Sequence, residues 1–209
     1  SRGLGDVYKR QLLSLKLGII CTIVCLLLAY PLAMILNGLK IKQQNFVVFI
    51  FILPMWMNFM LRILAWRLLL SNNGIVNALF QFFGFGTVKM LNTQTAVVFG
   101  MVYDFLPFMI LPIYNSMARI KNDVIEAAKD LGASDAIILF KIIIPLMMPS
   151  ITVCSFLCVT NGFKLYDQNL ALTNGAPSNM SEGLAMNITR TFYGRMGWEG
   201  VGQAKAVLF

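Results

Sequence analysis

One carboxylate set in an apolar stretch is the sharpest chemical signal in the sequence. Asp104 is flanked by Tyr103 and Phe105 inside a long hydrophobic run. A charge at the centre of a bilayer costs about 3 kcal/mol or more, so it usually faces a cavity or a partner. A carboxylate pairs with a cation, and aromatic faces add cation–π attraction. The three side chains therefore predict the lining of a path for cations.

A structural role for Asp104 competes with that interpretation. Arg62 lies in another apolar run, and an ion pair between the two would also satisfy the carboxylate. The residues alone favour the ion pair. Asn58 and Trp66 are further candidates for the path. Against them, an asparagine in a span more often bonds to a neighbouring helix, and a tryptophan often marks the membrane interface.

Composition places these side chains in a membrane protein. Of the 209 residues, 58% are hydrophobic and 12% are charged, which is too apolar for an ordinary soluble domain. There are no histidines, so histidine metal sites and Ser-His triads are excluded. Basic residues flanking membrane spans explain the net charge of +8 more simply than a nucleic-acid partner does. No Walker-type loop is present, so we expect a transport subunit without ATPase or catalytic residues of its own.

The four cysteines form two pairs with the spacing i, i+4 inside apolar runs. The first two are Cys21 and Cys25, and the other two are Cys154 and Cys158. Residues at this spacing share one face of a helix. We interpret all four as small buried side chains, not as metal ligands or disulfides, and we expect no metal or cofactor in this chain.

Long apolar runs predict the elements that position these residues. The fold class is an all-α membrane protein, a polytopic bundle with four complete spans and a truncated fifth at its end. The spans are expected at 12–36, 46–70, 95–117, 142–163 and 200–209. The second of them is expected to be interrupted, at Pro54, Asn58, Arg62 and Arg67. A short interfacial helix is expected at 75–83. Residues 1–11 are polar and basic, lack the features of a signal peptide and receive no function, and we interpret them as an artefactual leader outside the transport domain.

A polar, charged loop at 119–145 separates the third and fourth spans. Its alanines favour a helix, and Asp123 and Glu126 place negative charge at the N-terminal end, where the helix dipole stabilises it. Asn122 or Asp123 is expected to cap this helix. Gly132 should end it, and a second helix should begin at 133–135. A short helix with small residues on one face suits docking into a groove of a partner.

The spacing of this loop resembles the EAA loop of binding-protein-dependent ABC importer permeases. That pattern is Glu-Ala-Ala, three residues, Gly, nine residues, Ile, one residue and Leu-Pro, and the sequence departs from it only at Ile144. The matching residues of the coupling loop are Glu126, Ala127, Ala128, Gly132, Ile142 and Pro145. The alternative is an ordinary amphipathic loop between spans.

The resemblance implies a type I permease domain over 12–209, in which the loop at 119–145 seats in a cleft of a cytoplasmic ATPase. It also implies a multi-pass protein of the bacterial inner membrane, with the loop on the cytoplasmic side. The implied partners are ABC ATPase subunits that bind ATP, a second permease subunit, an extracytoplasmic substrate-binding protein and the lipid bilayer, with no nucleic acid.

Two different substrate families are suggested by different parts of the chain. The front portion, 17–150, resembles spermidine/putrescine permeases at 57–66, 72–77 and 102–114. The back portion, 150–209, resembles carbohydrate ABC permeases at 163–167, 172–177 and 202–207. We therefore predict a hybrid joined between 140 and 160, with a polyamine as the first substrate expectation and a sugar or oligosaccharide as the second.

Further alternatives concern the back portion and the class of protein. Tyr166, Asp167 and Gln168 could contact a sugar, although a re-entrant or periplasmic loop explains them more simply.

A channel or secondary transporter working without an ATPase would also be consistent with broken helices and with Asp104. Such a carrier has no need of the EAA loop, which makes that loop the discriminating feature.

Overall fold

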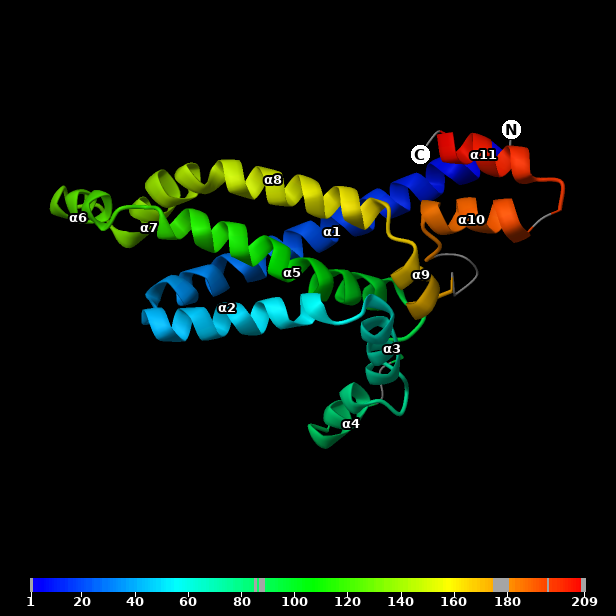
Figure 1. Ribbon diagram of the computed structural model, residues 1–209, viewed down its shortest axis with the longest axis horizontal. Coiled ribbons are helices and arrows are strands. Elements are labelled where there is room, and N and C mark those ends of the chain that lie inside the picture. The colour runs from blue at the N-terminus through cyan, green and yellow to red at the C-terminus, as the bar shows by residue number, and fades with distance from the viewer. Residues whose placement is uncertain (1, 85, 87–88, 175–180, 195, 208–209) are drawn as a thin grey trace. The chain divides into compact units, whose positions relative to one another are not determined.

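The computed structural model describes residues 2–84, 86, 89–174, 181–194 and 196–207. Every regular element among these residues is a helix (Figure 1). The chain divides into two compact units. Unit 1 comprises residues 1–21, 57–102 and 159–209, and unit 2 comprises residues 22–56 and 103–158.

Three helices are long and apolar enough to cross a membrane among the described residues. They are α1 (Arg2–Gly38), α5 (Gln94–Ala118) and the stretch Asp135–Phe163 that ends in α8 (Ile144–Phe163). Hydrocarbon offers no partner for backbone polar groups, so an apolar run of this length must satisfy them within its own helix. These helices confirm the spans predicted at 12–36, 95–117 and 142–163.

The predicted second span is interrupted. α2 (Ile41–Trp56) ends before Asn58, and α3 (Phe59–Leu69) begins after it. The Oδ1 atom of Asn58 accepts a hydrogen bond from the backbone N–H of Met60 at 2.9 Å, which caps the N-terminus of α3. The break falls at Asn58, one of the residues predicted to interrupt the span at 46–70, and the two helices make a fourth span if the interrupted pair counts as one.

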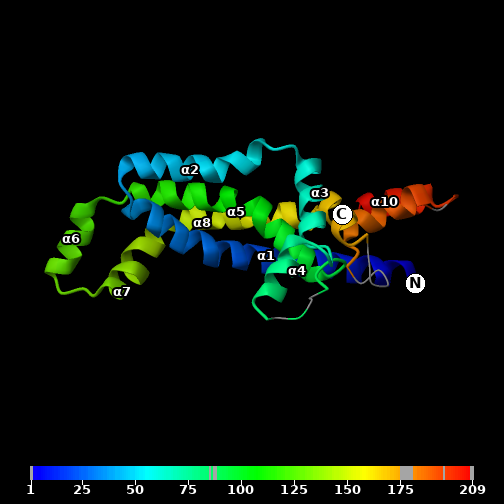
Figure 2. The same cartoon turned by 90° about the horizontal axis from the view of Figure 1, so that it is seen from below.

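Unit 2 is a bundle of helices that run side by side, as two views at right angles show (Figures 1 and 2). Tyr114 on α5 donates its hydroxyl to Oε1 of Gln44 on α2 at 3.3 Å. The hydroxyls of Ser116 on α5 and Ser150 on α8 also share a hydrogen bond. Side-chain hydrogen bonds of this kind hold helices together in lipid, where apolar contact alone gives little preference for protein over lipid.

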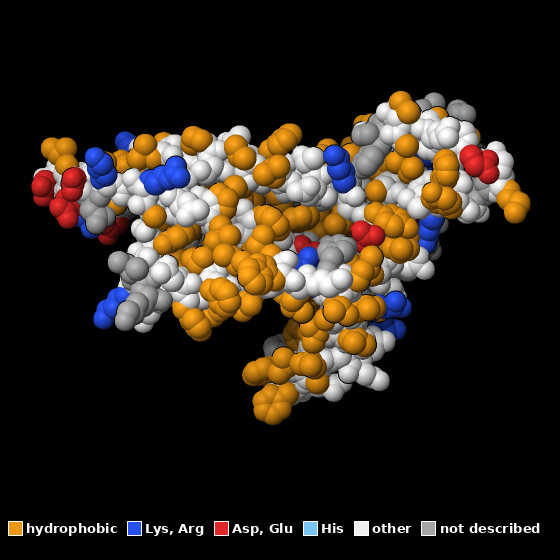
Figure 3. Space-filling view, in the orientation of Figure 1, with side chains coloured by type: hydrophobic (Ala, Val, Ile, Leu, Met, Phe, Trp, Pro, Cys, Tyr) orange, Lys and Arg blue, Asp and Glu red, His pale blue; other side chains and the backbone are white. Residues whose placement is uncertain are grey.

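The outward face of α2 in unit 2 is apolar. Phe46, Phe49 and Leu53 follow one another at helical spacing, and each is exposed. Hydrophobic side chains spread over the surface in the same way in the space-filling view (Figure 3). A water-facing helix would carry polar groups there, so this face is suited to lipid.

In unit 1, α1 and the end of α8 approach each other closely. A side chain at Gly18 would bring its Cβ atom within 3.2 Å of the Val159 carbonyl oxygen, and one at Gly162 would lie 3.1 Å from the Gly18 Cα. Glycine lets two helix backbones meet at this distance. The backbone N–H of Leu184 donates to Oγ of Ser14 at 2.9 Å, which joins a later segment of the chain to the same part of α1.

The later helices of unit 1 are short. They are α9 (Asp167–Leu172), α10 (Leu184–Gly194) and α11 (Glu199–Val207). At 1.5 Å per residue, the nine residues of α11 rise about 13 Å, which is less than the hydrocarbon thickness of a bilayer. The fifth span expected at 200–209 is thus represented by a helix too short to cross, and Leu208 and Phe209 lie outside the described residues.

The predicted short helix at 75–83 is confirmed as α4 (Ile75–Phe82) in unit 1. Its exposed face carries Ile75, Leu79 and Phe82, while Asn77 is buried and donates to the Ser71 carbonyl at 3.1 Å. An exposed apolar face beside a buried polar residue is typical of a helix that rests on a lipid surface.

A buried ion pair ties the beginning of α1 to the later part of unit 1. Glu182 is 3% exposed, and its carboxylate lies 3.2 Å from the Arg10 guanidinium and 3.8 Å from that of Arg190. Arg10 belongs to the segment interpreted as a leader. The structure continues α1 back to Arg2 and gives this arginine a partner within unit 1.

We predict that Arg10→Ala lowers the free energy of unfolding of the purified chain by about 2 kcal/mol. The buried Glu182 would lose its shortest ion pair and keep the 3.8 Å contact with Arg190 and a 3.4 Å hydrogen bond from the Asn187 amide. Unfolding in mixed detergent micelles measures the change in free energy. The control is Lys129→Ala, which removes an ion pair with Asp135 whose side chains are 56% and 92% exposed and should change nothing measurable. Equal effects of the two substitutions would show that the Arg10 contact does not stabilise the fold.

Candidate functional site

The predicted coupling loop is built as two short helices in unit 2. α6 (Asn122–Asp130) carries Glu126, Ala127 and Ala128, and α7 (Asp135–Ile138) follows it. The cap predicted for α6 is wrong. Lys121 takes the N-cap position without a side-chain bond, and the helix already begins at Asn122. Asp123 nevertheless lies in the first turn, where its charge complements the helix dipole.

Gly132 ends α6, as predicted. Its φ of +80° lies in the left-handed region, which glycine enters without strain. The backbone N–H of Ala133 donates to the Ala128 carbonyl at 3.0 Å, and that of Gly132 donates to the Lys129 carbonyl at 2.8 Å. This pair of bonds is a Schellman motif, which satisfies carbonyls that the helix end would leave without partners. Ser134 then caps α7, since its Oγ accepts from the Ile137 N–H at 3.4 Å.

The two faces of α6 differ in exposure. Ala128 is 8% exposed and Ile125 is partly buried, whereas Glu126 and Ala127 are exposed. Leu131, at the end of the helix, is 88% exposed. A short helix that presents a carboxylate, a small side chain and a large apolar one has the shape and chemistry to enter a groove on another protein.

A cavity of about 220 Å³ lies in unit 2 between α6 and the ends of α1 and α5. Ile125 contributes to its wall from the loop. The remaining lining residues come from α1, from α5 and the residues just after it, and from the turn directly before α8, and they are Met34, Asn37, Gly38, Met117, Ile120 and Ile143. Ile125 of α6 therefore shares the wall of this cavity with residues at the ends of two spans.

A wider helical turn joins the loop to the fourth span. Residues Leu139–Ile143 form the π-helical turn η1, directly before α8. Pro145 has no N–H and cannot donate to the carbonyl four residues earlier, so the regular bonding pattern is broken at this point. Turns of this kind inside a helix often occur at functional sites. Pro145 is exposed at the beginning of α8.

The predicted path residues fall into different units. Asp104 and Tyr103 lie on α5 in unit 2, where Asp104 is 8% exposed and Tyr103 is partly buried. Asn58 and Trp66 lie in unit 1, where Asn58 caps α3 and the Trp66 ring packs edge-on against Phe99 with centroids 5.0 Å apart. Asp104 is thus buried inside a span, as predicted, while its role in a path or an ion pair stays a prediction.

The structure gives the predicted sugar-contacting residues a position in unit 1. Tyr166 precedes α9 and Asp167 is its first residue, and both are partly buried. Gln168 is 1% exposed, which removes it from any surface that a sugar could reach directly. Part of the neighbouring 172–177 stretch, residues 175–177, lies outside the described residues.

Comparison with known proteins gives this arrangement a family. Residues 15–196 match the model described as "Binding-protein-dependent transport system inner membrane component". The chain is 39% identical over 140 residues to the "Spermidine/putrescine transport system permease protein PotB" of Haemophilus influenzae, over 66% of this chain and 49% of that protein. It is 30% identical over 202 residues to the "Probable starch degradation products transport system permease protein AmyD" of Thermoanaerobacterium thermosulfurigenes, over 92% of this chain and 66% of that protein.

A solved structure shares the fold. The chain aligns with a TM-score of 0.81 and 16% identity to a bacterial alginate ABC transporter in complex with an alginate pentasaccharide-bound periplasmic protein, covering 96% of this chain and 72% of that chain. This likeness confirms the all-α type I permease fold. The chain spans about half the length of the Haemophilus polyamine permease. Its apolar helices and its match over residues 15–196 show that the chain belongs to the family of inner membrane components of binding-protein-dependent transport systems.

Proposed function

We propose that this chain is the membrane-spanning part of an ATP-driven importer and that its loop at 119–145 couples the spans to a cytoplasmic ATPase. The observation that carries the proposal is the loop geometry. The Schellman motif at Gly132 fixes where α6 ends, and α6 leaves Glu126, Ala127 and Leu131 exposed. The family match supports the same class, because its members serve binding-protein-dependent transport.

The loop has two physical connections to the spans in unit 2. Through space, Ile125 of α6 meets residues at the ends of α1 and α5 around the cavity. Along the chain, α7 runs through η1 into α8. An ATPase that binds and hydrolyses ATP would move α6, and packed helices transmit such a shift because their interfaces deform little. The substrate would be delivered by an external binding protein, and a second permease subunit would complete the path.

A polyamine is the substrate that the front portion supports. The 39% identity to PotB of Haemophilus influenzae covers 66% of this chain. A polyamine carries ammonium groups along a methylene chain, so it needs a carboxylate for its charge and aromatic faces for its methylenes. Asp104, buried on α5 beside Tyr103 and Phe105, offers both. Trp66 would be a further aromatic candidate, and Asn58 a weaker one because it already caps α3.

A sugar or oligosaccharide is the second candidate. The relative named for starch degradation products matches over 202 residues, against 140 for the polyamine permease. The longer match supports a sugar as the second substrate candidate. A hybrid with a polyamine-like front portion and a sugar-like back portion, joined near 140–160, stays a prediction. The class of transporter would be the same in either case.

We expect Gly132→Val in the assembled transporter to weaken ATPase association and ATP-driven uptake by about tenfold, since a β-branched residue at φ +80° is strained by about 1–2 kcal/mol. No atom lies within 4 Å of a Cβ built on Gly132, so the effect would come from the backbone alone. Gly132→Asn should retain most of the function, because asparagine tolerates this conformation.

Gly84 supplies the matched control for that experiment. It has the same φ of +80° and the same open surroundings, but it follows α4 in unit 1. Gly84→Val should leave ATPase association unchanged. Unaltered uptake and association in Gly132→Val would refute the coupling role, and uptake that persists without any ATPase would favour a channel or secondary transporter.

For the substrate, we predict that Asp104→Asn slows spermidine uptake at least about tenfold while the transporter still assembles, because the carboxylate charge is lost with little change in volume. Asp104→Glu should keep part of the activity. Asp167→Asn, at the start of α9, is the comparison: it should spare polyamine uptake. Radiolabelled spermidine and a maltooligosaccharide, tested in the same vesicles, separate the two substrates. Unchanged spermidine kinetics in Asp104→Asn would remove this residue from the path.

A further inference from the structure

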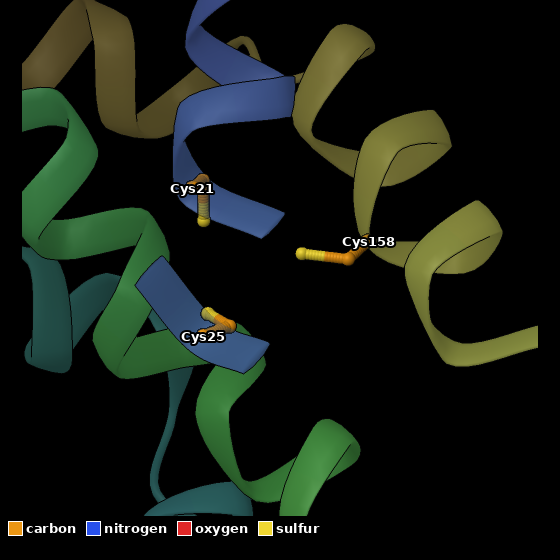
Figure 4. A group of neighbouring side chains, drawn as sticks. All are labelled: Cys21, Cys25 and Cys158. Atoms are coloured by element: carbon orange, nitrogen blue, oxygen red, sulfur yellow. The ribbon is translucent and has the colours of Figure 1, made fainter. Parts of the chain in front are cut away.

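Two cysteines that are distant in the sequence meet inside unit 2. The Sγ atoms of Cys25 on α1 and Cys158 on α8 lie within 4.8 Å of each other. Figure 4 shows these thiols, together with that of Cys21 one helical turn earlier on α1. Cys25 is fully buried and Cys158 is 4% exposed. None of the four cysteines of the chain forms a disulfide.

The donor atoms of this group are all sulfur. Among the described residues, no carboxylate joins the group, and the chain has no histidine. Thiolate is a soft ligand that selects ions such as Cu(I) and Zn²⁺. Structural zinc takes four protein ligands in a tetrahedron, which a group of cysteines on one turn of α1 and one position of α8 does not supply. An ion that needs only two sulfur ligands fits Cys25 and Cys158 better.

Distance and charge point to the same kind of ion. At a metal–sulfur distance of about 2.3 Å, two sulfurs on opposite sides of an ion lie about 4.6 Å apart, which is within the observed limit. A monovalent ion is neutralised by a single thiolate, and the second thiol can then bind without adding charge. An uncharged site is the least costly one in an apolar span.

We propose that Cys25 and Cys158 form a buried site for a soft monovalent cation of the Cu(I) type. The bound ion would link α1 to α8 within unit 2. Because α8 continues from η1 and the loop, this link would hold the span that receives movement from α6. That consequence for transport rests on the proposed function, whereas binding of the ion itself does not.

The test is anaerobic titration of the purified chain in detergent with Cu(I), in competition with the chromophoric chelator bathocuproine disulfonate. We expect one ion per chain. Cys25→Ser and Cys158→Ser should each weaken binding by at least about 100-fold, since each removes a direct ligand. Cys154→Ser is the matched control: it changes a buried cysteine one turn away on the same helix that is not part of the sulfur group, and it should bind as the unaltered chain does.

A second measurement on the unaltered chain keeps the proposal testable if a variant fails to fold. Alkylation by N-ethylmaleimide during partial unfolding in dodecyl sulfate reaches these buried thiols, and mass spectrometry reads it. Bound Cu(I) should protect Cys25 and Cys158, but not Cys154. No Cu(I) uptake by the unaltered chain, equal loss of binding in Cys154→Ser and Cys158→Ser, or equal protection of all cysteines would overturn the site. Any of these outcomes would leave the cysteines as packing residues and would not bear on the coupling loop.

Discussion

The absence of water in the bilayer governs this structure, because every backbone N–H and C=O must then find a partner within the protein. Long uninterrupted helices meet that requirement along α1, α5 and α8. At two of the helix ends, a local hydrogen-bonding arrangement satisfies groups that the helix leaves unpaired. Asn58 supplies a side-chain acceptor at the beginning of α3, and the Schellman motif at Gly132 closes α6. The places where such arrangements occur are also the places where the chain can change direction and carry function.

The same environment explains which contacts hold the helices together. Apolar side chains gain little by leaving lipid for protein, so specific polar contacts and close backbone approach decide the packing. In unit 2, the hydroxyl pair of Ser116 and Ser150 fixes α5 to α8. In unit 1, the Gly18–Gly162 approach brings α1 and α8 together, and the buried Glu182 joins α1 to the segment before α10. Each of these contacts fixes the partners of one helix, which apolar packing alone would not do.

Sequence patterns predicted the features that depend on residues close together in the chain, such as span length and helix ends. Hydrophobic length located three spans, and the Gly132 and Ser134 signals located the break between α6 and α7, because a left-handed glycine and a serine cap act within a few residues. Polar residues and a proline in the apolar run predicted an interrupted second span, and the break lies at Asn58, which caps α3. The cap of α6 was placed one or two residues late, because two polar residues follow Lys121 and either could have begun the helix.

The sequence pattern did not predict which residues of different helices become neighbours in the folded chain. The i, i+4 spacing of the cysteines correctly indicated a common buried face, yet it holds no information on which helix that face meets. Only the packing of α1 on α8 brings Cys25 to Cys158. The role of Asp104 could not be predicted for the same reason. The apolar run around it predicts that it is buried, but not which residue it contacts.

The predicted join between a polyamine-like front and a sugar-like back falls on η1 and α8, and the packing of unit 2 bears on whether such a chain can fold. Ser116 comes before the join, Ser150 lies within it, and their hydrogen bond links α5 to α8. Cys25 likewise comes before the join and Cys158 lies within it, and their sulfurs approach each other in unit 2. A shared fold requires only that the helix contacts match, whereas substrate choice depends on a few side chains inside the spans. The class of transporter can therefore survive a join that leaves its substrate ambiguous.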